Sequence, residues 1–141
     1  MFTKILLPVD LAEPRMSGAG IARGLALARL WESSLRLVYV QMLLPVAFAD
    51  YVPTDLGDRL RMAAEERILD FADRIDYPQE HISTAIRFGA AYSEILAEAD
   101  EWGADLIVMS SHRPGAATYF LGSTAAFVVR HAKCSVLIVR E

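Results

Sequence analysis

The sequence predicts an α/β domain built on an open, parallel, five-stranded sheet with helices on both faces. Short apolar runs alternate with longer helix-like stretches along the whole chain. Two of the runs, 4–10 and 105–110, lack polar alternation, as strands covered on both faces do. The length of 141 residues fits one domain, so we expect 1–141 to fold as a single unit.

The first expected strand, 4–10, precedes a helix over 14–31 that opens on a proline. Glycines Gly18, Gly20 and Gly24 should each weaken this helix by about 1 kcal/mol relative to alanine. We interpret them as points of close packing against the sheet. A phosphate-binding loop is the less favoured interpretation, because these glycines do not directly follow the strand.

The second expected strand covers 34–41 and leads into an apolar connection over 42–53. Thr54 is a suitable N-cap for the next helix. Apolar residues recur in that helix at offsets 0, 4, 8, 11 and 15 from Leu60, the strongest amphipathic pattern of the chain. The pair Tyr77-Pro78 should end it.

The segment 81–88 alternates polar and apolar residues, which predicts an edge strand. A helix over 90–102 follows, and Gly103 should end it. Three glutamates of this helix share one face, which is typical of a solvated surface. We therefore expect water around Glu94, Glu98 and Glu101.

The last elements are a strand over 105–110, a helix over 123–132 and a strand over 135–139. Placing the two most apolar strands centrally and the alternating third strand at an edge gives the strand order 3-2-1-4-5. The order reverses between strands 1 and 4, and ligands of such folds bind beside that switch point.

Residues that can bind a ligand follow the carboxyl ends of these two strands. The sequence Gly122-Ser123-Thr124 opens the last helix and offers N–H groups, hydroxyls and a positive dipole end to an anion. His112 and Arg113 add donors, and the Arg113 guanidinium can chelate phosphate oxygens. Asp10 stands across the crevice, where it can orient a ribose or bind a metal. The alternative left open is a simple N-cap with Arg113 in solvent.

Two stretches of the sequence resemble universal stress proteins. Pro8-Val9-Asp10 follows the first strand as in that family, and 107–140 is similar to its C-terminal third. The family ending Gly-Ser-x-Ala-x-x-Val-x-x-x-Ala-x-Cys-Pro-Val-Leu-x-Val is matched closely by 122–139. Ser-His-Arg-Pro at 111–114 is similar to a small bacterial subgroup. The resemblance implies a Rossmann-like fold of the adenine nucleotide alpha hydrolase type.

The resemblance also implies ATP as the ligand, with Mg²⁺ arriving on the nucleotide. No metal site is expected from the protein alone, although Asp10 can meet the Mg²⁺ of bound ATP. The two upstream glycine positions of ATP-binding members fall here on Met109 and His112, which should restrict the approach of phosphates to the backbone. The implied adenine contacts are Pro8, Val9, Asp10 and Val40, and the implied ribose and phosphate contacts are Met109, Ser111, His112, Arg113, Gly122, Ser123 and Thr124.

We therefore expect a regulatory, ATP-binding module of the stress response that acts through partners. An enzyme is the second interpretation, either a slow ATPase or a flavodoxin-like electron carrier, although Leu11-Ala12-Glu13-Pro14 offers no flavin phosphate loop. A nucleotide-free dimeric scaffold is the third. The resemblance implies a homodimer through the last strand, leaves a tetramer open, and suggests a regulated protein partner such as a transporter.

Composition excludes several other classes. The net charge of −4 and the lack of a basic tract argue against a nucleic-acid partner. The longest apolar run, 42–49, is far shorter than the roughly 20 residues of a membrane span, and no signal peptide is recognisable. The single Cys134 forms no intrachain disulfide and is best interpreted as a small buried hydrophobe. We expect a soluble, cytoplasmic protein.

Overall fold

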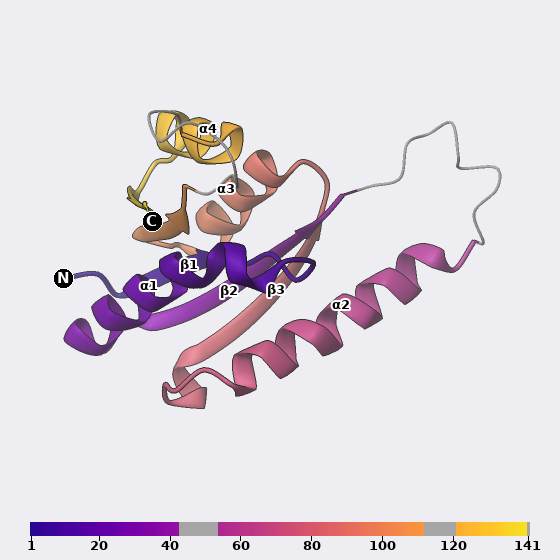
Figure 1. Cartoon of the computed structure of the whole chain (residues 1–141), viewed down its shortest axis with the longest axis horizontal. Coiled ribbons are helices and arrows are strands. Elements are labelled where there is room, and N and C mark those ends of the chain that lie inside the picture. The colour runs from indigo at the N-terminus through magenta and orange to yellow at the C-terminus, as the bar shows by residue number, and fades with distance from the viewer. Residues whose placement is uncertain (43–53, 112–120, 141) are drawn as a thin grey trace.

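The computed structural model describes residues 1–42, 54–111 and 121–140. All five strands run parallel in one sheet of order β3-β2-β1-β4-β5, which confirms the predicted fold class and strand order (Figure 1). β1 lies at the centre, and β3 and β5 are the edges. The strands are β1 (Lys4–Pro8), β2 (Ser34–Gln41), β3 (Ile82–Phe88), β4 (Leu106–Ser110) and β5 (Ser135–Val139).

The helices follow the predicted order with small shifts at their ends. The chain enters α1 through a 3₁₀ turn, η1 (Pro14–Ser17), and the predicted N-cap Thr54 was wrong by one residue. Asp55 precedes α2 instead, and its carboxylate pairs with Arg59 at 2.7 Å rather than capping the helix. The helices are α1 (Gly18–Trp31), α2 (Leu56–Asp73), α3 (Ala91–Trp102) and α4 (Ser123–His131), with a 3₁₀ turn η3 (Gln79–His81) before β3.

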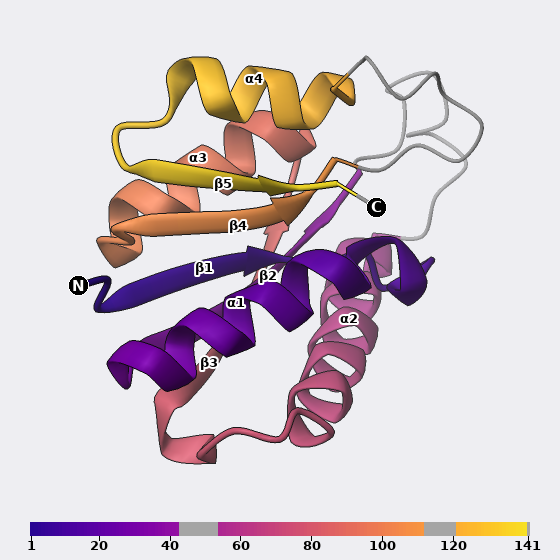
Figure 2. The same ribbon diagram turned by 60° about the vertical axis from the view of Figure 1, so that its left-hand side comes forward.

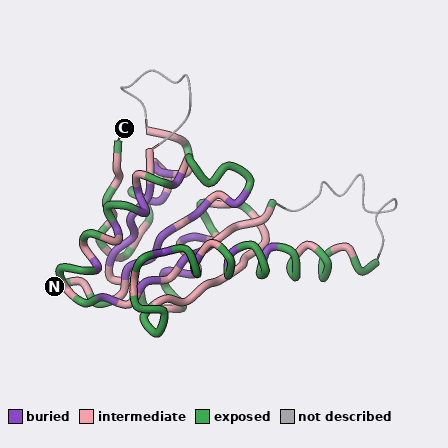
Figure 3. The backbone as a smooth tube through the Cα atoms, turned by 60° about the horizontal axis from the view of Figure 1, so that its bottom comes forward, coloured by how far each residue is buried: buried purple, intermediate pink, exposed green. Residues whose placement is uncertain are grey.

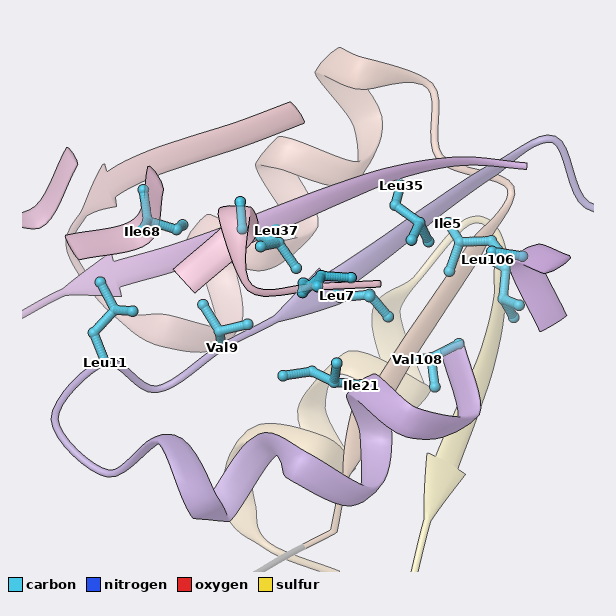
Figure 4. Close-up of a cluster of buried hydrophobic side chains, with 13 residues drawn as sticks. Ile5, Leu7, Val9, Leu11, Ile21, Leu35, Leu37, Ile68, Leu106 and Val108 are labelled. Carbon is cyan, nitrogen blue, oxygen red and sulfur yellow. The ribbon is translucent and has the colours of Figure 1, made fainter. Parts of the chain in front are cut away.

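The helices cover the two faces of the sheet in pairs, α1 with α2 and α3 with α4 (Figure 2). Alternate residues of each central strand point to opposite faces, so every central strand serves both cores. In β1, Ile5 and Leu7 face α1 and α2 (Figure 4), whereas Leu6 faces α3 and α4. This two-sided burial explains why β1 and β4 show no polar alternation.

The two helices of the first face pack very differently. α2 buries a single stripe, Ala64, Ile68 and Ala72, and leaves its outer surface exposed (Figure 3). α1 lies much closer to the sheet: a Cβ added to Gly20 would stand 3.0 Å from the backbone nitrogen of Ser110. A Cβ at Gly24 would stand 2.4 Å from Leu7 Cδ2. The interpretation as close-packing positions is confirmed for Gly20 and Gly24 and was wrong for Gly18, where an added Cβ meets nothing within 4 Å.

The second face departs from one expectation. Of the three glutamates that the sequence assigned to water, Glu98 is only 6% exposed. Its side chain lies between α3 and the sheet, where it meets arginines of β2 and β3. That expectation was wrong for Glu98, because inward-facing arginines on separate strands supply partners that the helix pattern does not reveal.

Candidate functional site

Two cavities open at the carboxyl edge of the sheet, on either side of the junction between β1 and β4. The larger, named here the β1–β2 cavity, has a volume of about 400 Å³. Its floor and walls come from the ends of β1 and β2 and from the first turns of α3. It brings together Pro8, Val9, Asp10 and Val40, as the sequence predicted, and adds Tyr39, Gln41, Ala91 and Ile95.

The smaller cavity, named here the β4–α4 cavity, has a volume of about 90 Å³. It lies between the end of β4 and the start of α4. It brings together five more of the predicted residues, Met109, Ser111, Gly122, Ser123 and Thr124. The described residues of the predicted site thus separate into two adjoining groups at the topological switch point.

Asp10 is held in place by the backbone that follows it. Its Oδ1 accepts hydrogen bonds from the N–H groups of Ala12 and Glu13 at 2.9 and 3.2 Å. Its own N–H donates to the hydroxyl of Ser17 at 3.3 Å. One carboxylate oxygen thus stabilises the turn, and among the described residues none bonds Oδ2.

The N-terminus of α4 faces the smaller cavity. Gly122 precedes the helix with ordinary dihedral angles, φ −56° and ψ 153°, so its conformation does not itself require glycine. The nearest obstacle is the carbonyl oxygen of Ser111, 3.4 Å from the position of an added Cβ. Within the described part of the chain no side chain caps this terminus, and its N–H groups remain for an anion.

Two neighbouring residues fix the end of β4. The Ser110 hydroxyl accepts a hydrogen bond from the Gly20 N–H at 2.9 Å and so ties α1 to the strand. The Ser111 N–H donates to the carbonyl of Val139 at 2.9 Å, which continues the β4–β5 ladder beyond the strand. The Met109 side chain is 7% exposed and packs in the core beneath α3 and α4. Met109 therefore lines the cavity and also belongs to the core beneath α3 and α4.

The remaining predicted contacts, His112 and Arg113, lie outside the described residues. Among the residues that the structure does describe, no group of three or more His, Cys, Asp or Glu side chains could hold a metal ion. In the same part of the chain, no helix is long and apolar enough to cross a membrane.

A larger hollow of about 750 Å³ lies at the opposite, amino edge of the sheet. Three of its polar side chains, those of Arg29, Asp76 and Tyr77, already have partners within the fold. Arg29 bonds the carboxylate of Asp76 at 3.2 Å, and the Tyr77 hydroxyl donates to the Ser33 carbonyl at 2.7 Å. Burial, together with the nearby Glu32 carboxylate, raises the pKa of Tyr77 above its ordinary value. We therefore assign the functional site to the carboxyl edge.

Cys134 and His131 have structural roles. Cys134 is half-buried and packs against the core beneath α3 and α4, and burial raises the pKa of its thiol. Reactive cysteines have a lowered thiol pKa, so the raised pKa of Cys134 fits the predicted role as a small hydrophobic residue. His131 Nδ1 lies 2.9 Å from the carbonyl oxygen of Phe127 in the last turn of α4, where a histidine side chain can interact favourably with the helix dipole.

Four similarities to known proteins agree with this architecture. The profile of the universal stress protein family matches residues 1–140. Universal stress protein G of Shigella flexneri is 31% identical over 146 residues, which cover 99% of this chain and 100% of that protein. The structure of universal stress protein UspA from Lactobacillus plantarum superposes with a TM-score of 0.75 at 25% identity, over 98% of this chain and 97% of that one. A universal stress protein solved in complex with cAMP shares the fold, with a TM-score of 0.61 at 23% identity over 98% of this chain and 96% of that one.

Proposed function

The chain belongs to the universal stress protein family, and from that membership we propose that it binds ATP at the carboxyl edge of its sheet and acts as a nucleotide-dependent regulatory module. The observation that carries the proposal is the pairing of an apolar cavity with an anion-attracting helix terminus at the switch point. The two parts match the two chemical halves of a nucleotide, a flat base and a charged phosphate chain.

The β1–β2 cavity is the half that suits adenine. Its volume of about 400 Å³ falls within the range of small-molecule sites. Val9, Val40 and Ile95 give it an apolar lining, and the backbone at the end of β2 offers peptide groups to the edge of a purine. Asp10 stands at its mouth, where the Oδ2 oxygen can accept a hydrogen bond from a ribose hydroxyl.

The β4–α4 cavity is the half that suits phosphate. Backbone N–H groups at the start of α4 and the hydroxyls of Ser123 and Thr124 are donors for phosphate oxygens. Met109, which stands where ATP-binding members have glycine, lines this cavity and packs into the core beneath α3 and α4. Mg²⁺ would arrive on the nucleotide and neutralise part of its charge, with Asp10 as the protein carboxylate available to it.

Regulation is favoured over rapid catalysis. Asp10 is the carboxylate of this site among the described residues, and one of its oxygens already bonds two backbone N–H groups. It is therefore poorly placed to act as a general base. A slow ATPase and a nucleotide-free scaffold remain the competing functions. Cyclic AMP belongs in the ligand panel because a protein of the same fold was solved with it.

The test is calorimetric titration of ATP, ADP, cAMP and adenosine into the wild type and the variant Gly122→Val. A β-branched side chain at Gly122 projects toward Ser111 and narrows the smaller cavity. We expect ATP to bind at least tenfold more weakly, about 1.4 kcal/mol, with a smaller loss for adenosine. Gly57→Val is the matched control, since a Cβ at Gly57 meets nothing within 4 Å.

Each competing function gives a distinct result in that experiment. Unchanged ATP affinity in folded Gly122→Val would contradict the phosphate assignment. A wild type that binds no nucleotide, and that releases nothing absorbing near 260 nm on denaturation, would favour the scaffold. Release of phosphate from bound ATP would identify an ATPase, and bound yellow chromophore a flavin carrier.

The homodimer is proposed through β5. No described strand pairs with its outer side, and Leu137 is 38% exposed there. The Val139 carbonyl faces β4, so alternation directs the N–H of Val136 toward the open edge. Val136→Pro removes that donor without breaking the bonds to β4. Light scattering should give at least twice the monomer mass for the wild type and a shift toward monomer for the variant. A monomeric wild type at micromolar concentration would contradict the interface.

A further inference from the structure

Five charged side chains form a continuous network between α3 and the strands beneath it, named here the α3 ion cluster. Arg36 of β2 bonds Glu98 at 2.8 Å. Arg87 of β3 bonds Glu94 at 2.7 Å, Glu98 at 2.9 Å and Glu101 at 3.0 Å. Glu98 therefore lies between two guanidinium groups, and Arg87 spans three successive turns of the helix.

The centre of the α3 ion cluster is shielded from water, whereas the Glu101 side chain at its end is exposed. The Glu98 side chain is 7% exposed, and those of Arg36 and Arg87 are 24% and 20% exposed. The hydrogen bonds that Arg87 donates to Glu101 and Glu94 raise the pKa of its guanidinium above the ordinary range, which keeps it charged. Charge-assisted bonds of this kind are short and strongly directional, so they fix the position of a helix more tightly than apolar contacts do.

One end of the cluster adjoins the β1–β2 cavity. Arg87 is the register partner of Val40, which lines that cavity. Glu94 lies in the first turn of α3, between Ala91 and Ile95, and both of those residues also line the cavity. Glu94, which Arg87 bonds, therefore belongs to the same helical turn as the two α3 residues that line the cavity.

The turn before α3 reinforces this connection. Gly89 adopts φ +137°, and a Cβ added there would stand 3.1 Å from Glu94 Cγ. The Gly89 N–H donates to the carbonyl of Gln41 at 3.1 Å, and Gln41 is another lining residue. The Glu94 side chain therefore packs on the turn that joins the edge strand to the cavity wall.

We propose that Arg87 is a positioning residue for the ligand's base: by bonding Glu94 and Glu98 it fixes the start of α3, and with it the wall formed by Ala91 and Ile95. Arg87 itself is absent from the cavity lining and acts through the helix. The choice of an adenine base as ligand rests on the proposed function, whereas the anchoring of the wall rests on the contacts alone.

The cluster contains its own matched control. Arg36 and Arg87 bond the same Glu98 carboxylate and are buried to a similar extent. Arg36 otherwise bonds Ser83 at 2.9 Å and lies over the Trp102 ring, at the far end of α3. Arg36→Met and Arg87→Met thus remove equivalent charges from one cluster, but only the second releases Glu94.

The first measurement compares the affinities of adenosine and inorganic tripolyphosphate for the wild type and these two variants. Arg87→Met should weaken adenosine about tenfold and leave tripolyphosphate unchanged, because the wall borders only the base half. Arg36→Met should change adenosine binding less than about twofold. Arg87→Lys should fall between the wild type and Arg87→Met, since one ammonium cannot reproduce the planar fork of the guanidinium.

The second measurement needs no ligand. Amide hydrogen exchange at residues 94 and 95 should rise more in Arg87→Met than in Arg36→Met, whereas general destabilisation would raise it equally in the two variants. Equal adenosine losses in the two methionine variants, or equal exchange at residues 94 and 95, would overturn the positioning role. A wild type that binds neither adenosine nor ATP would refute the proposed function, and the exchange comparison would still decide whether Arg87 anchors the wall.

Discussion

α1 and α3 lie on opposite faces of the same sheet and are held there by opposite means. α1 carries glycines where it crosses the strands, and at Gly20 the helix comes within contact of the β4 backbone. α3 stands over charged side chains, with Glu98 buried between Arg36 and Arg87. One helix is fixed by the absence of side chains, the other by long side chains that bond one another.

The two arrangements have different physical consequences. Close packing tolerates no added atoms, because the neighbouring backbone has nowhere to move. An ion cluster tolerates changes of shape but not the loss of one partner, which leaves the remaining charges without compensation. The α1 face should therefore respond most strongly to added volume, and the α3 face to lost charge.

The largest effect is expected on the α1 face. Gly20→Val places a branched side chain against the backbone of Met109 and Ser110, which lie 3.1 and 3.0 Å from the added Cβ. We expect a loss of about 3 kcal/mol in the free energy of unfolding, seen as a lower urea midpoint. Gly18→Val is the control, because the Cβ added there meets nothing within 4 Å and its effect on stability should stay below about 0.5 kcal/mol. Similar losses in both variants would mean that proximity to the β4 backbone does not govern the response of this face.

The next effect is expected on the α3 face. Glu98→Ala leaves two partly buried guanidinium groups with fewer acceptors, and we expect it to lower the free energy of unfolding by about 2 kcal/mol. Glu101→Ala removes a partner that is 68% exposed, so its effect should stay below about 0.5 kcal/mol. The difference between the variants should persist in 1 M salt, since buried pairs are screened less than exposed ones. A difference that vanishes in salt would show that Glu98 acts as a surface charge.

The same comparison explains which parts of the fold were predictable. Apolar runs and helical periodicity specify β1, β4 and the strand order, because burial on both faces leaves a direct mark on the sequence. The three glutamates of α3 share a face, and that spacing is typical of a solvated surface. Their partners stand on two other strands, so no local pattern links them. The available signal was Arg36, a charge inside an otherwise apolar strand, which requires a buried partner.

The residues of the candidate site also include some that could be predicted from the sequence and some that could not. The places of Asp10 and Gly122 beside the cavities were predictable, because strand ends and helix starts meet at the switch point of a parallel sheet, whereas Pro8 and Val40 were named from the family resemblance. Ala91 and Ile95 were missed as lining residues. An alanine and an isoleucine carry no recognisable binding chemistry, and their place in the wall depends on the turn at Gly89, which only the folded chain shows.

The carboxylate of Asp105 differs from that of Glu98 in its partners. Asp105 is bonded by backbone N–H groups, whereas Glu98 is bonded by arginines. Asp105 joins the starts of β1 and β4: it accepts hydrogen bonds from the N–H groups of Thr3 and Lys4 at 2.8 and 3.0 Å. The Thr3 hydroxyl donates a third bond at 3.0 Å. Burial alone would raise the pKa of Asp105, but these hydrogen bonds outweigh it and hold the pKa below its ordinary value.

The smallest effect follows from that shift. A carboxyl whose pKa is lower in the folded than in the unfolded chain stabilises the fold above its unfolded pKa, and this contribution is lost as the pH falls through the folded value. Asp105→Asn should therefore lower the free energy of unfolding by about 1 kcal/mol at pH 7, because the amide NH₂ meets N–H groups that need an acceptor. The gap between wild type and variant should narrow below about pH 4. Asp100→Asn, which removes an exposed partner of Lys133, should leave the pH dependence almost unchanged. The free energy of unfolding of all three proteins is measured by urea titration from pH 7 to pH 3. If the difference between the wild type and Asp105→Asn stayed constant with pH, the effect of the substitution would come from side-chain packing, and the charge of Asp105 would have no part in it.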